Sequence, residues 1–525
     1  MVDYNTKQYL TRELKGRVKK NLSGFFRVWL VGFLVLLQIA AIVYLSFLLR
    51  SLTIYFYIIL EILSILIIVS LVNDNRSPSY KISWICMILV LPITGHIMYA
   101  LWGKSGSKKK IEKKIRAKIN HGATFLEENN EIIQVFSKKH PKNIRLSKYL
   151  ISEKYPLFKN NSFKYFPMGE NAFEAIFKEL QQAKKFILID FFIVAEGVLW
   201  DKMHEILLDR IKHGVEVKFL YDDFGAMLRT PKHFNKILEQ EGFEVRVFNP
   251  IHKYTDKLFM NYRSHHKIIV IDGNVGFTGG INLADEYANL IDRFGVWKDN
   301  AICIKGDGVW GLTVTFLQMW EVCFEREFLD YSKYKPTMKF EANEVYAQVF
   351  ADGPVNNPNI PVESICKQMI NYCEEYLYIT TPYLVIEDDM KNTLITAAKS
   401  GVDVRIITPH IPDKKSVKIL TNYNYGLLLK GGVKIYEYTP GFIHAKTILN
   451  ENAAIVGTMN MDYRSFYLHY ECGILMYDQN LIDTIKKDIL DTIAVCHEVT
   501  YEEWVNRPFI LKVNQLILNL FSTIM

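Results

Sequence analysis

The sequence predicts an α/β protein made of two tandem copies of one domain. Each copy is a parallel or mixed sheet flanked by helices, and the copies pack about a pseudo-twofold axis behind N-terminal transmembrane helices. Three observations predict this fold. The order of strand and helix patterns in residues 161–345 recurs in residues 346–505, each copy carries one His-x-Lys motif, and long apolar runs occupy residues 25–103. Strands that alternate with helices in this way are typical of sheets with helices on their faces.

Residues 1–24 form a basic tail, and residues 25–103 contain apolar runs at 28–49, 52–72 and 82–102. Each run is close to the roughly 20 residues that cross a bilayer. Such runs lack the polar face that a helix of a soluble domain shows. We therefore expect two or three of them to be membrane segments. The first run is too long for a cleavable signal peptide.

Lysines and arginines indicate the side of the membrane. The N-terminal tail and residues 104–118 are both basic, and basic flanks stay in the cytoplasm. We therefore expect a multi-pass protein of the cell membrane whose catalytic part lies at the cytoplasmic face. Three full crossings cannot place both basic segments there, so either one run is re-entrant or interfacial, or the tail is translocated. Pro92 and Gly95 are positions at which the third run can break.

Residues 104–160 and 506–525 are expected at the membrane surface. The first segment is a basic, helix-like linker, in which each charge near an anionic surface contributes about 1 kcal/mol. Its alternative is an ordinary solvated helix. The second segment has Pro508 at a helix-opening position and is strongly apolar but too interrupted to span, which suits an interfacial helix. Its alternative is a helix packed on the catalytic domain.

The repeat in residues 161–345 and 346–505 can be followed strand by strand. Each copy shows a buried apolar strand, a helix, and two further strands that begin with glycine: 186–193, 214–221 and 242–248 in the first copy, and 376–380, 401–407 and 432–436 in the second. Gly, Pro and Asn in residues 351–359 indicate the link between copies. Two like halves bring equivalent strand ends together, which predicts one cleft shared by both.

Composition excludes several functional classes. The seven cysteines are an odd number and form no Cys-x-x-Cys pair, which argues against a disulfide framework or a zinc site and fits a reducing compartment. The net charge of +7 is modest and is concentrated beside the membrane segments, so we expect no nucleic-acid partner. We expect no metal and no cofactor, and the oligomeric state is left open.

Two motifs carry the candidate chemistry. Each consists of a histidine, a lysine two residues later, a carboxylate five residues after the lysine, and a small-residue turn followed by an asparagine. The first motif comprises His265, Lys267, Asp272 and Asn282, and the second comprises His444, Lys446, Glu451 and Asn460. Period-two alternation puts each histidine and its lysine on one face of a strand. The second motif differs in having glutamate as its carboxylate and a turn shorter by one residue.

These residue types suit phosphodiester exchange. One histidine can attack phosphorus, and the other can protonate the leaving oxygen and then deprotonate the incoming one. The lysines and asparagine amides would hold the charged phosphoryl oxygens. We expect Asp272 and Glu451 to orient histidines or lysines by hydrogen bonding, with the histidine of the other copy as the preferred partner.

At these residues the chain resembles the phospholipase D superfamily, and its flanking sequence resembles the bacterial cardiolipin synthases within it. The resemblance covers residue 52 to the C-terminus. The matching pieces are residues 261–267, 278–287, 297–299, 353–354, 381–383 and 459–465.

The resemblance implies a membrane-bound phosphatidyltransferase that converts two phosphatidylglycerol molecules into cardiolipin and glycerol through a phosphohistidine. Phosphatidylglycerol and other anionic lipids are then its partners. We assign His265 as nucleophile and His444 as acid and base, because the first motif is intact. A hydrolytic phospholipase D and a catalytically impaired membrane scaffold are the alternatives.

Overall fold

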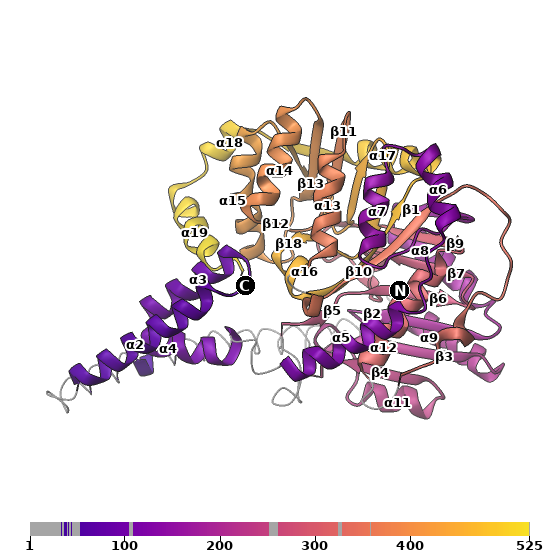
Figure 1. The fold of residues 1–525 in the computed structure, drawn as a ribbon, viewed down its shortest axis with the longest axis horizontal. Helices are drawn as coiled ribbons and strands as arrows, with labels where there is room; N and C mark the ends of the chain where they lie inside the picture. The colour runs from indigo at the N-terminus through magenta and orange to yellow at the C-terminus, as the bar shows by residue number, and fades with distance from the viewer. Residues whose placement is uncertain are drawn as a thin grey trace, which may run out of the picture. The chain divides into compact units, whose positions relative to one another are not determined.

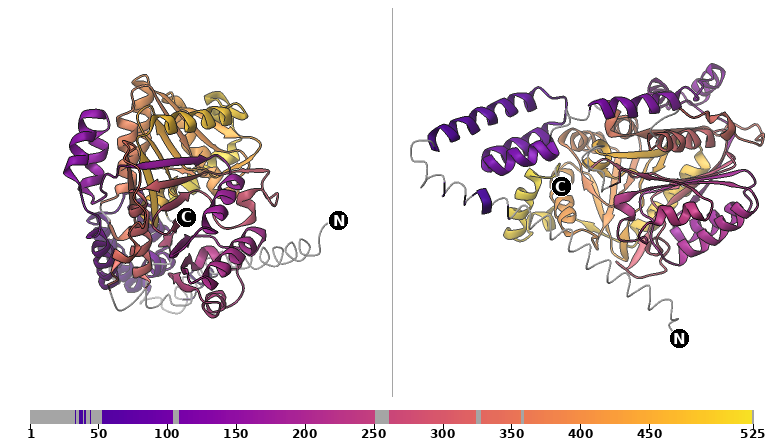
Figure 2. Two further views of the ribbon diagram at one scale, coloured as in Figure 1. Left: turned by 90° about the vertical axis from the view of Figure 1, so that its right-hand side faces the viewer. Right: turned by 90° about the horizontal axis from the view of Figure 1, so that it is seen from below.

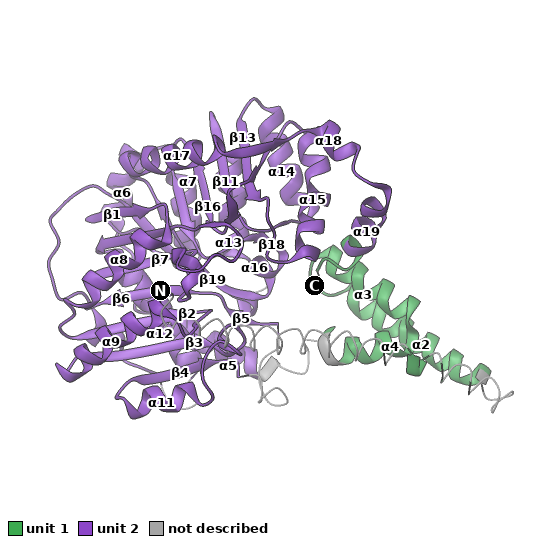
Figure 3. Ribbon diagram, turned by 180° about the vertical axis from the view of Figure 1, so that it is seen from behind, with its two compact units in different colours: residues 1–109, 519–525 green, residues 110–518 purple. Residues whose placement is uncertain are grey.

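The computed structural model describes residues 53–103, 109–250, 261–323, 328–356 and 359–523, with isolated positions between residues 33 and 44. The chain separates into two units, coloured in Figure 3: unit 1 is Met1–Lys109 with Asn519–Met525, and unit 2 is Lys110–Leu518. Both candidate motifs lie in unit 2. Apart from the isolated positions, the apolar run predicted at 28–49 lies outside the described residues.

The apolar run predicted at 52–72 forms a helix in unit 1. This helix, α2, spans Thr53–Val72, and its segment Ile54–Val72 is long and apolar enough to cross a membrane. Most of its large side chains are exposed, including Ile54 and Leu66. It is the single helix of this kind in the described part of the chain.

The apolar run at 82–102 is broken at Pro92, one of the two positions at which a break was expected. Helix α3 (Pro78–Val90) ends before Pro92, and helix α4 (Pro92–Met98) continues into a π-helical turn, Tyr99–Gly103. Proline lacks an N–H and restricts the residue before it, so the helix stops there. Helix α4 then packs closely on α3, since a Cβ on Gly95 would lie 2.5 Å from the Met87 carbonyl oxygen.

In unit 2, the first lobe is built on a seven-stranded sheet of order β1-β9-β7-β6-β2-β3-β4. Strands β2, β3 and β4 are parallel and the other neighbours are antiparallel. The predicted sheet is therefore confirmed as mixed. Its strands are β1 (Asn161–Phe166), β2 (Phe186–Phe191), β3 (Glu216–Asp222), β4 (Glu244–Phe248), β6 (Lys267–Ile271), β7 (Val275–Gly279) and β9 (Ala301–Gly306).

The second lobe repeats this order as β10-β19-β17-β16-β11-β13-β14, with β20 added at the edge. The parallel part is again the equivalent trio, β11, β13 and β14. Its strands are β10 (Ala347–Asp352), β11 (Tyr376–Thr380), β13 (Asp403–Pro409), β14 (Lys434–Tyr438), β16 (Thr447–Asn450), β17 (Ala454–Gly457), β19 (His469–Met476) and β20 (Cys496–Val499). The predicted duplication is thereby confirmed.

Helices and sheets of unit 2 form layers (Figures 1 and 2). One hydrophobic cluster lies between the sheets and includes α12 and α17, and two outer clusters lie under the flanking helices. Both faces of the central strands are therefore buried, which explains their continuous apolar runs. The helices of the first lobe are α8 (Gly169–Leu180), α9 (Val198–Lys212), α10 (Asp223–Ala226), α11 (Phe234–Gln240) and α12 (Val309–Val322); those of the second are α13 (Pro361–Asn371), α14 (Asp388–Lys399), α15 (Lys415–Lys430), α16 (Tyr463–Tyr467) and α17 (Gln479–Ile493).

In the linker predicted at 104–160, residues 109–152 form three helices, which belong to unit 2 apart from Lys109. They are α5 (Lys109–Ala123), α6 (Asn130–Lys139) and α7 (Ile144–Ser152). In α5, Ile115 is buried and the Lys118 ammonium donates to the Glu321 carbonyl oxygen at 2.6 Å, whereas Lys113 and Lys114 remain exposed. The C-terminal segment forms α18 (Tyr501–Val505) and α19 (Phe509–Leu520).

Two short parallel bridges join the lobes. Strand β5 (Arg263–Ser264) of the first lobe pairs with the start of β19, and β15 (Gly441–Ile443) of the second lobe pairs with β8 (Val296–Lys298). The bridges are equivalent by the repeat, because each one immediately precedes a motif histidine. This reciprocity is what a pseudo-twofold relation between the lobes produces.

Candidate active site

The two motif histidines occupy equivalent positions in the lobes. His265 stands between β5 and β6, and His444 stands between β15 and β16. The backbone N–H of His265 donates to Tyr470 O at 2.9 Å, and that of His444 donates to Lys298 O at 2.7 Å. The lobe-joining bridges thus fix the backbone of each histidine against the opposite lobe.

Each histidine also contacts a buried carboxylate of the opposite lobe. His265 Nδ1 lies 2.9 Å from Glu471 Oε2, and His444 Nδ1 lies 2.6 Å from Asp299 Oδ2. A carboxylate at Nδ1 holds the ring proton there and leaves the Nε2 lone pair for chemistry. Both imidazoles are therefore held in the tautomer that can attack phosphorus or accept a proton.

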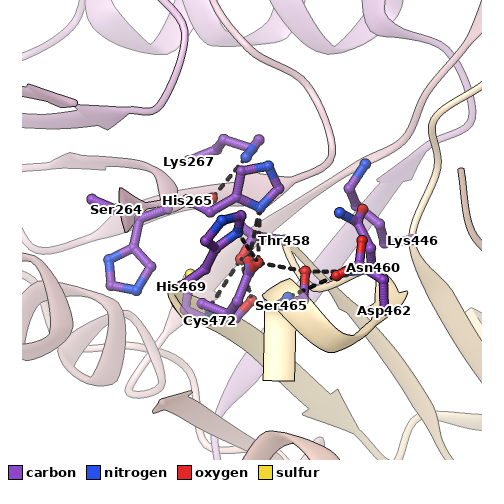
Figure 4. Close-up of polar contacts among 12 residues, drawn as sticks. Ser264, His265, Lys267, Lys446, Thr458, Asn460, Asp462, Ser465, His469 and Cys472 are labelled. Atoms are coloured by element: carbon purple, nitrogen blue, oxygen red, sulfur yellow. Dashed lines mark hydrogen bonds and ion pairs between the residues drawn. The ribbon is translucent and has the colours of Figure 1, made fainter. Parts of the chain in front are cut away.

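Further hydrogen bonds hold the two carboxylates. The hydroxyls of Thr458 and Ser465, both labelled in Figure 4, donate to Glu471 at 2.6 and 2.8 Å. The Asn300 backbone N–H donates to Asp299 at 2.8 Å. Their orientation is thus fixed before any substrate arrives.

The motif lysines lie on the same strand face as their histidines, as alternation predicts. Lys267 donates from Nζ to the His265 carbonyl oxygen at 2.7 Å. Lys446 donates in the same way to the His444 carbonyl oxygen, and its Nζ lies 2.9 Å from His444 Nδ1. All four side chains are buried, so the site concentrates cationic groups in a low-dielectric environment.

Burial and mutual repulsion shift the titration of these groups towards their neutral forms. Burial, reinforced by Lys267, lowers the pKa of His265 well below its usual value. Burial and Lys446 lower the pKa of His444 to about 4. Burial lowers the pKa of Lys446 to about 7 and that of Lys267 to about 8. An anionic phosphodiester would raise these pKa values again, because it favours the charged form of each cation.

The two carboxylates differ in their electrostatics. Burial raises the pKa of Glu471 to about 8, although Lys267 opposes the shift. Burial also opposes ionisation of Asp299, but His444 and Lys446 outweigh it and lower the pKa of that carboxyl. The two histidine–carboxylate pairs are consequently not equivalent, even though their geometry repeats.

The prediction that Asp272 orients a histidine or lysine is wrong. Its carboxylate accepts the backbone N–H groups of Lys184, Lys185 and Phe186 at 2.7 to 2.9 Å. Asp272 follows the far end of β6, about 16 Å along the strand from Lys267 at some 3.3 Å per residue. It therefore fixes the start of β2 against the end of β6.

The same correction holds for Glu451. Its carboxylate accepts the backbone N–H groups of Glu374, Glu375 and Tyr376 at 2.8 to 3.4 Å. These residues precede or begin β11, which is the equivalent of β2. Glutamate can accept these backbone hydrogen bonds as aspartate does. The replacement of aspartate by glutamate in the second motif therefore does not change the surroundings of the histidines.

The two asparagines have different surroundings. Asn282 is engaged within the protein: its Oδ1 accepts from the Ile193 N–H at 3.0 Å, and its Nδ2 donates to the Tyr287 hydroxyl at 2.8 Å. The Tyr287 ring in turn packs against His444, with centroids 5.4 Å apart. Asn460 is buried, and its Oδ1 makes no hydrogen bond to any described residue. A phosphoryl oxygen accepts hydrogen bonds, so a contact from Asn460 would have to use its Nδ2, and the role expected for this residue stays a prediction.

The small-residue turn has a steric reason. A Cβ on Gly280 would lie 1.9 Å from Asp299 Oδ1, and Gly279 has a φ of +150°. Only glycine allows the chain to pass this close to the carboxylate that holds His444.

Sequence reasoning missed Asp299 and Glu471 as histidine partners. They lie 145 and 206 residues from the histidines that they contact. A signal was present, because Asp299 ends the short motif at 297–299 that matches the resembled family. No role could be given to it without knowing that β8 pairs with β15.

Comparisons with known proteins agree with this architecture. The family described as "Cardiolipin synthase, PLD-like domain" matches residues 176–304 and 366–492, and "Phospholipase_D-nuclease N-terminal" matches residues 62–104. The chain is 30% identical to a cardiolipin synthase of Halalkalibacterium halodurans, over 90% of this chain and 94% of that protein. It is 31% identical to cardiolipin synthase 1 of Staphylococcus aureus, over 89% and 96%.

Two further similarities extend this picture. An uncharacterized protein of Streptococcus mutans is 36% identical over 87% of this chain and 98% of that protein. Among solved structures, the phosphatidylserine synthase of Haemophilus influenzae is similar in fold, with a TM-score of 0.55 and 13% identity over 72% of this chain and 98% of that one.

Asp272 and Glu471 give opposite expectations on mutation. Asp272→Asn weakens charge-assisted bonds to three backbone N–H groups, so we expect the free energy of unfolding to fall by about 1–3 kcal/mol with turnover per folded molecule retained. Glu471→Gln leaves the fold but loses the proton holder of His265, so we expect turnover to fall by about 10²–10⁴-fold. Thermal unfolding and a phosphodiester turnover assay measure both. Equal loss of turnover in the two variants would restore Asp272 to the catalytic set.

The lysines predict an alkaline limb in the pH profile. Binding an anionic phosphodiester requires charged lysines, and deprotonation begins near the pKa of about 7 for Lys446 and continues near about 8 for Lys267. We therefore expect kcat/KM to fall as pH rises through this range, since kcat/KM reports groups of the free enzyme. In Lys446→Arg the cation persists to high pH, so the limb moves upward. An unchanged limb would contradict the assignment of Lys446.

Proposed function

The chain belongs to the cardiolipin synthase family of phospholipase D-like proteins, and on this premise we propose that it joins two phosphatidylglycerol molecules into cardiolipin and glycerol through a phosphohistidine on His265. It is a phosphatidyltransferase of the phospholipase D type, and its substrates are lipids. The observation that carries the mechanism is the pair of histidines, each with its Nδ1 on a carboxylate of the opposite lobe.

In the first step, Nε2 of His265 attacks the phosphorus of the donor lipid. The bond from phosphorus to the glycerol oxygen breaks, and His444 delivers the proton that lets glycerol leave. Lys267 and Lys446 stabilise the charge on the non-bridging oxygens. Protonated His444 is stabilised by Asp299, whose lowered pKa keeps that carboxylate charged.

In the second step, His444 takes the proton from a glycerol hydroxyl of the acceptor lipid. That oxygen attacks the phosphorus and displaces His265, whose Nδ1 proton remains on the Glu471 side. The assignment of His265 as nucleophile agrees with the electrostatic difference between the pairs. A charged carboxylate suits the histidine that must become an imidazolium, and this histidine is His444.

We propose that α2 anchors the enzyme in the cell membrane and that unit 2 lies on its cytoplasmic face. The homologues imply membrane association, and α2 is apolar and long enough to span. The exposed lysines Lys113 and Lys114 follow the membrane region directly, which favours the cytoplasm and anionic headgroups. A re-entrant hairpin of α3 and α4 in place of a third crossing would allow the basic N-terminal tail and the basic segment at 104–118 both to lie in the cytoplasm.

We propose that α19 is an interfacial helix. Its polarity is reversed relative to an ordinary surface helix: Gln515 is fully buried, accepts from Arg507 Nε at 2.6 Å and donates to the Ile419 carbonyl oxygen at 3.3 Å. Its large apolar side chains are instead exposed, namely Phe509, Ile510, Val513, Leu516, Ile517 and Leu520. Spacings of three and four residues place them on one face, as a helix lying in a bilayer surface requires.

The function is tested with purified protein in phosphatidylglycerol vesicles. We expect equimolar cardiolipin and glycerol from the wild type and neither product from His265→Asn or His444→Asn. Phosphatidic acid as the sole product would show hydrolysis instead of transfer. An inert wild-type protein would support a scaffold.

The same variants distinguish nucleophile from acid when the donor is a phosphatidyl-p-nitrophenol, whose leaving group needs no proton. We expect His444→Asn to release a burst of one p-nitrophenolate per enzyme and to retain a phosphatidyl group on His265, recovered after alkaline denaturation. His265→Asn should give no burst. The reverse pattern would assign the nucleophile to His444.

The proposal that α19 lies in the membrane surface is tested by labelling α19 in full-length protein whose partly exposed cysteines are replaced by serine. We expect a polarity-sensitive fluorophore on Ile517→Cys to report an apolar environment in anionic vesicles and to be quenched by lipid-borne quenchers. The matched position is Asn514→Cys, an exposed polar site beside the apolar face. Equal solvent accessibility at both positions would overturn the proposal.

A further inference from the structure

A third histidine breaks the symmetry of the active site. The register of the two bridges makes His469 the equivalent of Trp297: His469 pairs with Arg263, two residues before His265, and Trp297 pairs with Phe442, two residues before His444. The Trp297 ring packs 5.6 Å from His444, and the His469 ring packs 5.4 Å from His265. The first lobe thus presents an indole where the second presents an imidazole.

His469 uses little of its hydrogen-bonding capacity. Its Nδ1 is buried without a hydrogen bond to any described residue, and the nearest carboxylate contact, Glu471 Oε1, is 3.6 Å away. The side chain as a whole is only 11% exposed. A buried nitrogen with no partner is costly unless something else satisfies it.

The neighbouring donors lie at distances that suit a small cation. One nitrogen each of His265 and His469 and one oxygen of Glu471 lie within 4.8 Å of one another. The contacts from Glu471 to the two rings are 3.0 and 3.6 Å. Ligand atoms about 2.0–2.2 Å from a tetrahedral ion lie about 3.3–3.6 Å from one another. The two contacts of Glu471 are already close to this range, so binding requires mainly that the nitrogens of His265 and His469 move closer together. Figure 4 shows the rings of His265 and His469 close to each other.

We propose that His265, His469 and Glu471 bind a divalent transition-metal ion such as Zn²⁺, and that the bound ion inhibits the enzyme. Two imidazoles and one carboxylate are a ligand set that favours Zn²⁺, Cu²⁺ or Ni²⁺ over Mg²⁺ and Ca²⁺. The effect on turnover rests on the proposed function of His265, whereas the binding itself does not.

Inhibition follows from the tautomer of His265. An ion at Nδ1 takes the lone pair there, so the single ring proton must reside on Nε2. The Nε2 lone pair that would attack phosphorus is then lost, and Glu471 is drawn to the metal. No proton leaves the histidine, because the ring only exchanges one tautomer for the other.

The surrounding charge limits the affinity. Lys267, Arg464 and Lys414 act on His469 as positive neighbours, and a cation entering the site must overcome them. We therefore expect inhibition in the micromolar range and no tightly held structural ion. An anionic lipid in the site would compete through these same lysines and arginine.

The experiment uses the full-length enzyme in vesicles with Zn²⁺ as the probe and Mg²⁺ as the comparison. We expect Zn²⁺ to inhibit the wild type and Mg²⁺ not to do so. His469→Asn and His469→Trp should raise the half-inhibitory zinc concentration by at least about tenfold, as loss of a metal contact does. The rate of each variant is normalised to its own rate without metal. His469→Trp copies the residue that the other lobe already accommodates.

A second readout does not require turnover. Detergent-solubilised wild type should give the visible absorption of a cobalt–imidazole complex with Co²⁺ and a zinc-dependent rise in Tm, and both should be lost in the His469 variants. The matched control is His204→Asn, which removes a histidine–carboxylate pair outside the site, with His204 Nε2 2.7 Å from Glu241 Oε2. Unchanged cobalt absorption in the His469 variants, or equal zinc sensitivity in all the proteins, would overturn the proposal. Retained metal binding without any lipid product would instead overturn the proposed function alone.

Discussion

The exchange of carboxylates between the lobes is the constraint on which this site depends. Glu471 of the second lobe holds His265 of the first, and Asp299 of the first holds His444 of the second. The bridges β5–β19 and β8–β15 set the register that makes both contacts possible. Each motif histidine is therefore paired with a carboxylate of the opposite lobe, and the two catalytic pairs form only when the two sheets are packed together.

Much of this arrangement was accessible from the sequence. Alternation placed His265 with Lys267 and His444 with Lys446, and the repeated order of strands gave two equivalent sheets. The carboxylates were misassigned because spacing within a motif reports strand geometry alone. The distance from Lys267 to Asp272 reflects only the length of β6. The Asp272 carboxylate binds backbone N–H groups at the start of the neighbouring strand, β2. Partners that arise from pairing between distant strands, such as Glu471, leave no local spacing to detect.

In the membrane region, too, the local properties of the chain were predicted more readily than its packing. Hydropathy predicted α2 correctly because a long apolar helix is a local property. Hydropathy alone gives one run at 82–102, whereas Pro92 marks where the helix ends, and the structure has the break there. For α19, composition left two alternatives, interfacial or packed on the catalytic domain. Gln515 is buried and bonds to the Ile419 carbonyl oxygen, whereas Ile517 is exposed. Helix α19 therefore contacts the rest of unit 2 through its polar face, and its apolar face points away from it.

The difference between Trp297 and His469 has an evolutionary consequence. In a symmetric dimer of single-lobe chains, one gene encodes both sides of the site, so any substitution appears twice. Covalent fusion of two copies removes that coupling, and each half can then change alone. An indole beside one histidine and an imidazole beside the other is an asymmetry that a dimer of identical chains cannot carry, and it allows each half of the site to change independently.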